Sequence, residues 1–316
     1  MTRAAPDAVR VAAICLLVDR VSAEVVSALR AAGVPSLLMK GPAISTWIYA
    51  GEPRSYADTD LLLREADWKR ATAVLECLGF ADDLAPLDRP RTGSLDSHPY
   101  VRAADGAAVD LHLTLFGIEA APAEVWAAFT AEAVPLEVGG VQVAVPSYRA
   151  RALHIAMHAV QHGGDAHPKP MRDLELALER VPREVWAEAL ELARELRAEA
   201  AFAAGLGLTG RGRSLAAAIG ATSAPRSARA RLRVEGTPLA EGFLELAATR
   251  RRDRLALLLA VLIPRPSFMR WWTPLARRGI RGLAAAYAWR WVWLLWRAVP
   301  GYVAWRRAAR GSRRVA

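Results

Sequence analysis

Two acidic residues with the spacing Asp-x-Asp, Asp58 and Asp60, lead directly into the apolar residues 61–63. In a strand, alternate side chains project to the same face, so these two carboxylates lie side by side and repel each other unless a cation neutralises them. Magnesium suits this arrangement, because hard divalent cations bind oxygen ligands and keep positions open for a substrate phosphate. Asp-x-Asp is a common motif, so its surroundings decide its meaning.

A third carboxylate, Asp110, lies in a segment that alternates strictly between apolar and polar residues. The alternation predicts a strand on which Asp110, His112 and Thr114 share one face. Three carboxylates on two strands are what a two-metal phosphoryl or nucleotidyl transfer site requires. His112 shares the face of Asp110, so it is a candidate for orienting a metal-bound carboxylate or the acceptor hydroxyl.

Lys40 and Gly41 lie upstream of the acidic pair, at the predicted junction of a short strand and a turn. A lysine at the end of a buried strand is a natural point charge for binding phosphate. Arg54, four residues before Asp58, is a candidate for neutralising a triphosphate. It is one of many arginines, and a surface or structural ion pair is the alternative for it.

These motifs resemble the bacterial "uncharacterised nucleotidyltransferase" family, which belongs to the DNA polymerase beta-like superfamily. The resemblance rests on residues 37–43, 54–63, 78–80 and 109–112, and extends to 154–173, 264–268 and 274–275. It implies that Asp58, Asp60 and Asp110 bind the metals and that Gly41 opens the phosphate-binding turn. The superfamily usually has a serine or a second glycine after that glycine. Pro42 stands there in this chain, which leaves the choice of nucleotide open.

The order of predicted elements indicates an α+β protein with two domains. Residues 1–146 are predicted to form a polymerase beta-like nucleotidyltransferase domain with a mixed sheet and flanking helices. Gly139 and Gly140, between alternating apolar residues, predict a β-hairpin at its end. Residues 147–316 are predicted to form an α-helical domain with an Arg/Trp-rich C-terminal end. The elements expected before the hairpin are helices at 9–32, 42–50 and 65–78 and strands ending at Met39 and at 58–63, 99–102 and 109–115.

Three histidines, His154, His158 and His162, recur every fourth residue and therefore stack along one helix face. Two such histidines can bind zinc, but a zinc site needs further ligands, and no HExxH motif is present. The favoured interpretation is a polar helix face beside the active-site cleft. On that interpretation His158 and His162 are candidates for contacts to nucleotide or acceptor.

The C-terminal end is strongly basic. Residues 250–316 contain sixteen arginines and one acidic residue, a net charge of +15, which leaves −5 for residues 1–249. Seven of the eleven tryptophans also lie there, with Trp289, Trp293 and Trp296 on one helix face and Arg290 and Arg297 on another. Contact with an anionic partner is predicted, with a lipid interface favoured over nucleic acid. In the alternative, the Trp face packs onto other helices and the arginines are solvated.

Two cysteines without a CxxC spacing, Cys15 and Cys77, argue against a disulfide framework and favour a reducing compartment. No charge-free run approaches the ~20 residues that a membrane-spanning helix needs. The predicted location is therefore cytoplasmic, with peripheral contact at the inner face of the membrane as an open alternative.

The predicted function is Mg²⁺-dependent transfer of a nucleoside monophosphate from an NTP to a hydroxyl or phosphate of an acceptor. Resemblance alone suggests a small-molecule or peptide acceptor and an accessory role in a biosynthetic cluster. One alternative is a catalytically silent protein of the same fold that binds membrane or nucleic acid through its basic helices. The other is a histidine-based metallohydrolase, which zinc content would reveal.

Overall fold

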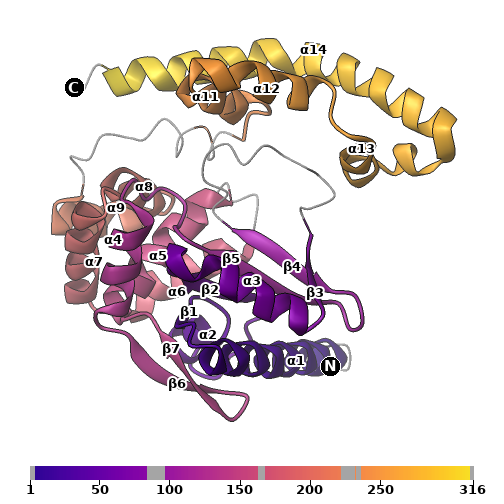
Figure 1. Ribbon diagram of the computed structural model, residues 1–316. Coiled ribbons are helices and arrows are strands. Elements are labelled where there is room, and N and C mark those ends of the chain that lie inside the picture. The colour runs from indigo at the N-terminus through magenta and orange to yellow at the C-terminus, as the bar shows by residue number, and fades with distance from the viewer. Residues whose placement is uncertain (1–3, 84–96, 163–167, 222–231, 233–235, 314–316) are drawn as a thin grey trace. The chain divides into compact units, whose positions relative to one another are not determined.

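The core of the N-terminal part is a mixed five-stranded sheet with the order β1-β2-β5-β4-β3. β2 and β5 are parallel neighbours, and the other pairs are antiparallel. The computed structural model describes residues 4–83, 97–162, 168–221, 232 and 236–313 (Figure 1). The strands of this sheet are β1 (Ser36–Leu38), β2 (Thr59–Leu63), β3 (Phe80–Asp82), β4 (His98–Arg102) and β5 (Ala107–His112).

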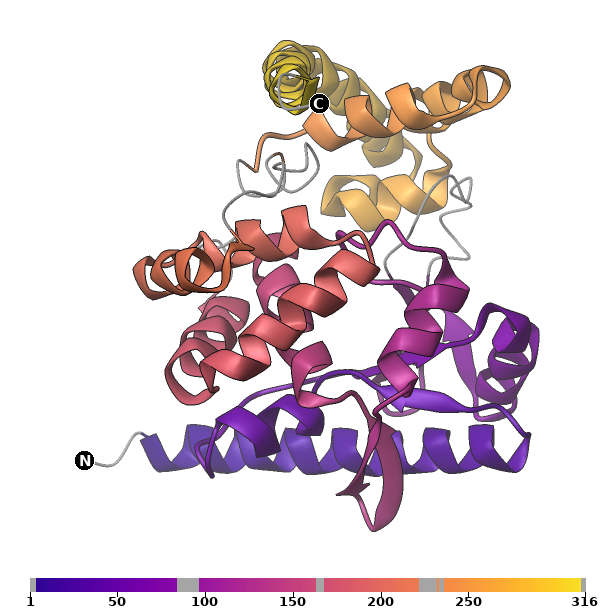
Figure 2. The same ribbon diagram turned by 90° about the vertical axis from the view of Figure 1, so that its left-hand side faces the viewer.

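The two faces of the sheet carry different residues because side chains alternate along each strand. Leu61, Leu63 and Leu111 belong to a core with residues from α1 and α3. A separate hairpin, β6 (Val134–Val138) and β7 (Val141–Val145), lies together with α1 beside the sheet (Figure 2). Leu62 and Met39 belong to the opposite core, which is built mainly by helices.

Helices flank the sheet and continue the chain after the hairpin. Those of the N-terminal part are α1 (Ala4–Ala31), α2 (Pro42–Ile48), the 3₁₀ turn η1 (Glu65–Asp67), α3 (Trp68–Cys77), α4 (Pro122–Thr130), α5 (Tyr148–Gln161), α6 (Pro168–Arg180), α7 (Arg183–Glu195), α8 (Glu199–Leu206) and α9 (Gly210–Ile219). Helix α5 is the centre of this helical layer, because it packs against α6, α7 and α8.

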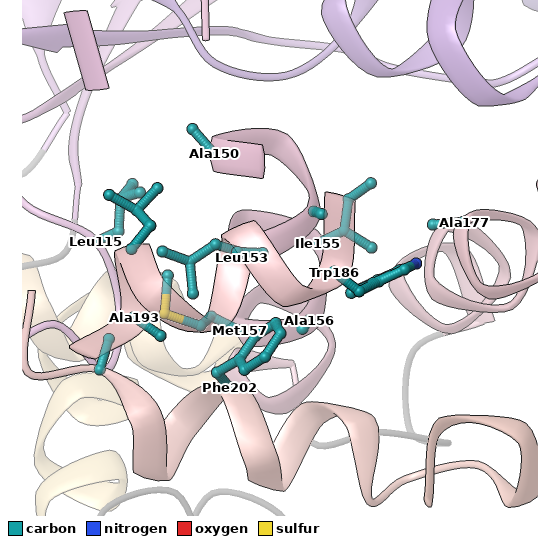
Figure 3. Close-up of a cluster of buried hydrophobic side chains, with 14 of the residues drawn as sticks. Leu115, Ala150, Leu153, Ile155, Ala156, Met157, Ala177, Trp186, Ala193 and Phe202 are labelled. Carbon is teal, nitrogen blue, oxygen red and sulfur yellow. The ribbon is translucent and has the colours of Figure 1, made fainter. Parts of the chain in front are cut away.

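The larger hydrophobic core lies around α5. Leu153, Met157, Trp186 and Phe202 fill its centre, and Leu115, three residues after the end of β5, joins it (Figure 3). Small residues on α5 and α8 allow the two helix backbones to approach closely. Since the same core also contains residues of β1, β2 and α2, the helices α5 to α9 are continuous with the sheet rather than a separate layer.

The described residues form two compact units, which we call the N-terminal unit (up to residue 221) and the C-terminal unit (from residue 232). The C-terminal unit consists of α11 (Ala240–Ala248), α12 (Arg251–Leu262), α13 (Pro266–Trp272), the 3₁₀ turn η5 (Pro274–Arg277) and α14 (Gly279–Arg313). Its small cores join α14 to α13 and η5 at one position and to α11 at another.

The predicted α+β class is confirmed, and so is the hairpin with its turn at Gly139 and Gly140, both of which have positive φ. β7 ends at Val145, so the change from strands to helices occurs where the boundary at residue 146 was predicted. The compact units, however, divide near residue 225, because α5 to α9 share the core of the sheet. Helix α4 has no counterpart among the predicted elements.

Gly205 on α8 provides a test of the packing at the centre of this core. A Cβ there would lie 2.1 Å from the carbonyl oxygen of Ala156, so α8 would have to move away from α5. We expect Gly205→Ala to lower the free energy of unfolding by about 3 kcal/mol. Gly210→Ala on α9 is the matched control, because its Cβ would have no neighbour nearer than 3.8 Å. Urea unfolding of both variants checks this, and equal stability would contradict the packing argument.

Candidate functional site

The parallel pairing of β2 and β5 brings two of the predicted carboxylates together. Asp60 is the register partner of Asp110, and Leu62 is the partner of His112. Residues paired in this way share a face, so Asp60, Asp110 and His112 all project from the face toward the α5 core. Their ligand atoms lie within 4.8 Å of one another, and among the described residues this is the group that could hold a metal ion.

Lys40 and His112 both contact the same oxygen of Asp60. The Lys40 Nζ donates to Asp60 Oδ1 over 2.5 Å, and His112 Nε2 lies 3.1 Å from that oxygen. Asp60 and His112 are buried, and the Lys40 side chain is only 16% exposed. Lys40 therefore lies beside the carboxylates and neutralises one of them, and its contact with a triphosphate stays a prediction.

The charges of these groups shift one another's pKa. Burial alone would raise the pKa of Asp60, but Lys40 and His112 outweigh it and hold that pKa well below its usual range. Burial alone would lower the pKa of Lys40, but attraction to Asp60, and to Asp58 and Asp110, raises it. Burial and the charge of Asp60 raise the pKa of Asp110. The positive charge of Lys40 is therefore too small to neutralise Asp58, Asp60 and Asp110 together.

This imbalance fits a divalent cation. Asp60 and Asp110 offer oxygen ligands, which magnesium prefers, and His112 offers a nitrogen beside them. Since the pKa of Asp110 is raised by burial and by Asp60, an added cation would relieve a repulsion that Lys40 alone leaves. The residues present thus fit a magnesium site.

Asp58 lies just before β2 and is not part of the closest group of ligand atoms. Burial and the charge of Asp60 raise its pKa, which places it within electrostatic reach of the site. Its role as a metal ligand stays a prediction. Lys169 on α6 also acts on Asp58, and motif reasoning did not select it. The one signal for Lys169 is that it is one of only three lysines in the chain.

Gly41 has the backbone conformation that the turn before α2 requires. Its φ of 56° and ψ of −119° lie in a region that favours glycine. A Cβ would also approach the Tyr56 ring to 3.3 Å. Gly41 follows Lys40 directly, so the turn begins at the end of the segment that carries the lysine.

Arg54 forms a buried ion pair with Asp173 on α6. Its Nε and Nη2 donate to the two oxygens of Asp173 over 2.8 and 2.7 Å, and both side chains are 1% exposed. Tyr49 also donates its hydroxyl to Asp173 Oδ1. The structure therefore shows a structural ion pair that joins the segment before β2 to α6, and contact of Arg54 with a triphosphate stays a prediction. Asp173 lies 119 residues away, and no motif indicates this pairing.

The three histidines stack along α5 as predicted. The ring centroids of His154 and His158 are 5.7 Å apart, and those of His158 and His162 are 4.5 Å apart. Burial, reinforced by the charge of Lys40, lowers the pKa of His154 to about 3 and also lowers that of His158. Both lie within electrostatic reach of Asp60, so this face borders the site. Among the described residues, the three do not form a metal-compatible group. The next histidine in the sequence, His167, lies outside the described residues.

The neutral state of His154 predicts a pH-dependent stability. Its pKa is about 3 in the folded chain and 6.5 as the ordinary value, so below pH 6.5 the unfolded chain binds a proton that the folded chain excludes. This contribution to stability is complete above pH 6.5 and is lost toward pH 3, by up to about 1.4 kcal/mol per pH unit. We expect His154→Gln to flatten the dependence between pH 6.5 and 5 in urea unfolding. A wild-type slope in the variant would contradict this.

Comparison with known protein families finds one family to which the chain belongs. The sequence profile of the uncharacterised nucleotidyltransferase family matches residues 8–211, which span β2, β5 and the helices up to the start of α9. The chain therefore belongs to this nucleotidyltransferase family, as the resemblance predicted, and is a transferase. No curated protein matches the sequence.

Solved structures of other nucleotidyltransferases show a weaker likeness. A solution structure of the antibiotic-resistance factor ANT(2″)-Ia is 18% identical with a TM-score of 0.38, covering 59% of this chain and 91% of that one. A crystal structure of ANT(2″)-Ia with adenylyl-2″-tobramycin is 19% identical with a TM-score of 0.37, covering 54% and 93%. An antigenic nucleotidyltransferase-like protein from Paracoccidioides brasiliensis is 15% identical with a TM-score of 0.33, covering 58% and 92%. Such TM-scores define neither the acceptor nor the nucleotide.

Proposed function

We propose that the protein is a magnesium-dependent nucleotidyltransferase that moves a nucleoside monophosphate from an NTP to an acceptor. The observation that supports this proposal best is the in-register pairing of Asp60 with Asp110, with Lys40 and His112 on the same Asp60 oxygen. Asp60, Asp110 and the neighbouring Asp58 would hold magnesium. When bound, the metal supplies charge stabilisation for the α-phosphate and the leaving group.

Each residue near the site has a distinct part in this proposal. Lys40 attracts the triphosphate, and Gly41 lets the backbone approach it closely because no Cβ intervenes. His112 holds the Asp60 carboxylate in place through its contact with Oδ1. Asp110 helps to remove the proton of the acceptor hydroxyl as a general base.

The transfer is an in-line displacement at the α-phosphorus. The acceptor oxygen forms a bond to that phosphorus as its proton passes to Asp110. The bond between the α-phosphorus and the bridging oxygen breaks, and pyrophosphate leaves with the electron pair. We propose a small-molecule or peptide acceptor that offers a hydroxyl or phosphate, and a role as an accessory enzyme of a biosynthetic cluster.

Pyrophosphate release tests this function. Each of the four NTPs is incubated with Mg²⁺ and a panel of hydroxyl-bearing small molecules and peptides, and the mass added to the acceptor is determined. We expect pyrophosphate release that requires both partners and stops in EDTA. Hydrolysis of an NTP that is independent of acceptor and of Mg²⁺, with no nucleotide added to any acceptor, would contradict the proposal.

Gly41 provides a second test, aimed at the phosphate pocket. Gly41→Val should raise the KM for NTP by about tenfold or more, because the side chain disfavours the backbone conformation and meets the Tyr56 ring, which displaces the turn that we assign to the phosphates. Gly51→Val is the matched control, since Gly51 also has positive φ but no atom within 4 Å of its Cβ position. Both variants lose stability through strain, but only Gly41→Val should change KM in steady-state assays. Equal KM values in the two would place the pocket elsewhere.

A further inference from the structure

Helix α14 buries small residues, an arginine and Leu294, while most of its large apolar side chains are exposed. Ala286, Gly301 and Ala304 lie on its buried side. Arg290 is also buried there, and its guanidinium donates to the carbonyl of Val261 over 2.7 and 3.2 Å. It also lies over the rings of Phe268 and Trp272, at 5.1 and 5.2 Å from their centroids. The alternative in which this arginine is solvated is therefore wrong.

The opposite side of α14 is apolar and exposed. We call it the α14 outer face, which consists of Trp289, Trp291, Val292, Leu295, Trp296, Val299, Tyr302 and Val303. Leu295, Trp296 and Val299 are 72%, 65% and 69% exposed. Trp293, which the sequence grouped with Trp289 and Trp296, is half-buried and makes an edge contact with Trp272. An ordinary surface helix has the reverse pattern, so this face indicates a partner.

Arginines flank the outer face at both ends of the helix. Arg277, Arg278 and Arg281 precede it, and Arg306, Arg307 and Arg310 follow it, all of them exposed. Figure 1 shows α14 as one long helix with α11, α12 and α13 along it. Helix α12 adds a second exposed apolar group, which includes Leu255 and Leu259. In the sequence this group follows two exposed arginines, Arg251 and Arg252.

We propose that the α14 outer face binds the interfacial layer of an anionic lipid bilayer, lying in the membrane plane. Tryptophan and tyrosine favour the boundary between headgroups and acyl chains, and the flanking arginines match anionic headgroups. Among the described residues, no helix is long and apolar enough to cross a bilayer. This inference is independent of nucleotidyl transfer.

Charge and shape favour this partner over two others. A second copy of the chain would bring together two segments that each carry a net charge of +15, which costs electrostatic free energy. A nucleic acid would need cations spread across the contact, whereas the exposed side chains at the centre of the outer face are Leu295, Trp296 and Val299. Arg297 beside them is only partly exposed, and its guanidinium lies 4.5 Å from the centroid of the Trp296 ring. In an anionic bilayer, the acyl chains match the apolar centre of the outer face and the anionic headgroups match the basic ends of the helix.

Co-sedimentation of the full-length protein with vesicles tests the proposal. We expect binding to phosphatidylglycerol–phosphatidylcholine vesicles at low salt, weaker binding at high salt, and little binding to phosphatidylcholine alone. Leu295→Glu should weaken the binding by about tenfold or more, because it replaces an inserted leucine by a charge. Val299→Glu should act in the same direction. Leu17→Glu is the matched control, because Leu17 on α1 is comparably exposed, and it should bind like the wild type.

Three results would overturn the proposal. One is a lack of co-sedimentation with anionic vesicles at low salt by the folded wild type. Another is equal binding by Leu295→Glu, Val299→Glu and the wild type. The third is a shift from dimer to monomer in light scattering of Leu295→Glu, which would make this face an interface between copies. Because Leu295 and Val299 are exposed, both variants should keep wild-type circular dichroism and nucleotidyl transfer.

Discussion

Asp60→Asn should lower the rate of nucleotidyl transfer by about a thousandfold or more without changing the fold. Asp60 is at the centre of the site, because it is paired with Asp110 on the neighbouring strand and is contacted by Lys40 and His112. Asparagine keeps the shape of the side chain but removes the charge that a divalent cation requires. Loss of a few kcal/mol of transition-state stabilisation corresponds to this fall in rate. Single-turnover transfer assays provide the measurement.

The control must separate chemistry from stability. Asp60→Asn leaves the largely buried ammonium of Lys40 without its partner, which itself destabilises the protein. The double variant Asp60→Asn/Lys40→Met removes that unpaired charge and should recover part of the stability. It should remain inactive, because the metal ligand is still missing. Turnover near the wild-type rate in either folded variant would contradict the role of Asp60.

Arg54→Met should lower the free energy of unfolding by about 3–5 kcal/mol, the largest stability effect that we expect from one polar substitution. It would leave the buried Asp173 carboxylate without its bidentate partner. The Tyr49 hydroxyl would still donate to Asp173, but a neutral donor does not offset a full negative charge. Urea unfolding of the variant provides the measurement.

Arg172→Met is the matched control, because Arg172 is half-exposed and lies 3.5 Å from Glu52 at the surface. Its removal should cost less than about 1 kcal/mol. Arg54→Met/Asp173→Leu should be more stable than Arg54→Met alone, since both charges are gone. Equal stability of Arg54→Met and Arg172→Met, with a higher KM for NTP in Arg54→Met, would favour the nucleotide-binding role predicted from sequence.

The sheet and the centre of the site could be predicted because strand alternation is a local pattern. Asp60, Asp110 and His112 share a face as a direct result of the twofold repeat of side chains in β2 and β5. The turn at Gly41 was visible for a similar reason, since its positive φ is a local demand on the backbone. Helix α4 has a local signal of the same kind. Its first turn begins with Pro122, and Glu124 accepts a hydrogen bond from the backbone of Ala121.

Contacts between distant segments could not be predicted in this way. The partner of Arg54 is Asp173 on α6, and nothing in the spacing of either residue indicates the other. The continuity of α5 to α9 with the sheet depends on the shared core, which is why the compact units divide later in the chain than the change from strands to helices. Periodicity placed Arg290 opposite the Trp face of α14, but it could not show that the arginine side is the buried one.

The central claim is that Asp60 and Asp110 form a site at which magnesium and an NTP bind together. Isothermal titration of each of the four NTPs, with Mg²⁺ and with EDTA, tests this claim without knowledge of the acceptor. We predict that at least one NTP binds the wild type in Mg²⁺, binds much more weakly in EDTA, and binds Asp110→Asn weakly under both conditions. Nucleotide affinity that is the same in Mg²⁺ and EDTA, or that Asp110→Asn leaves unchanged, would contradict the account.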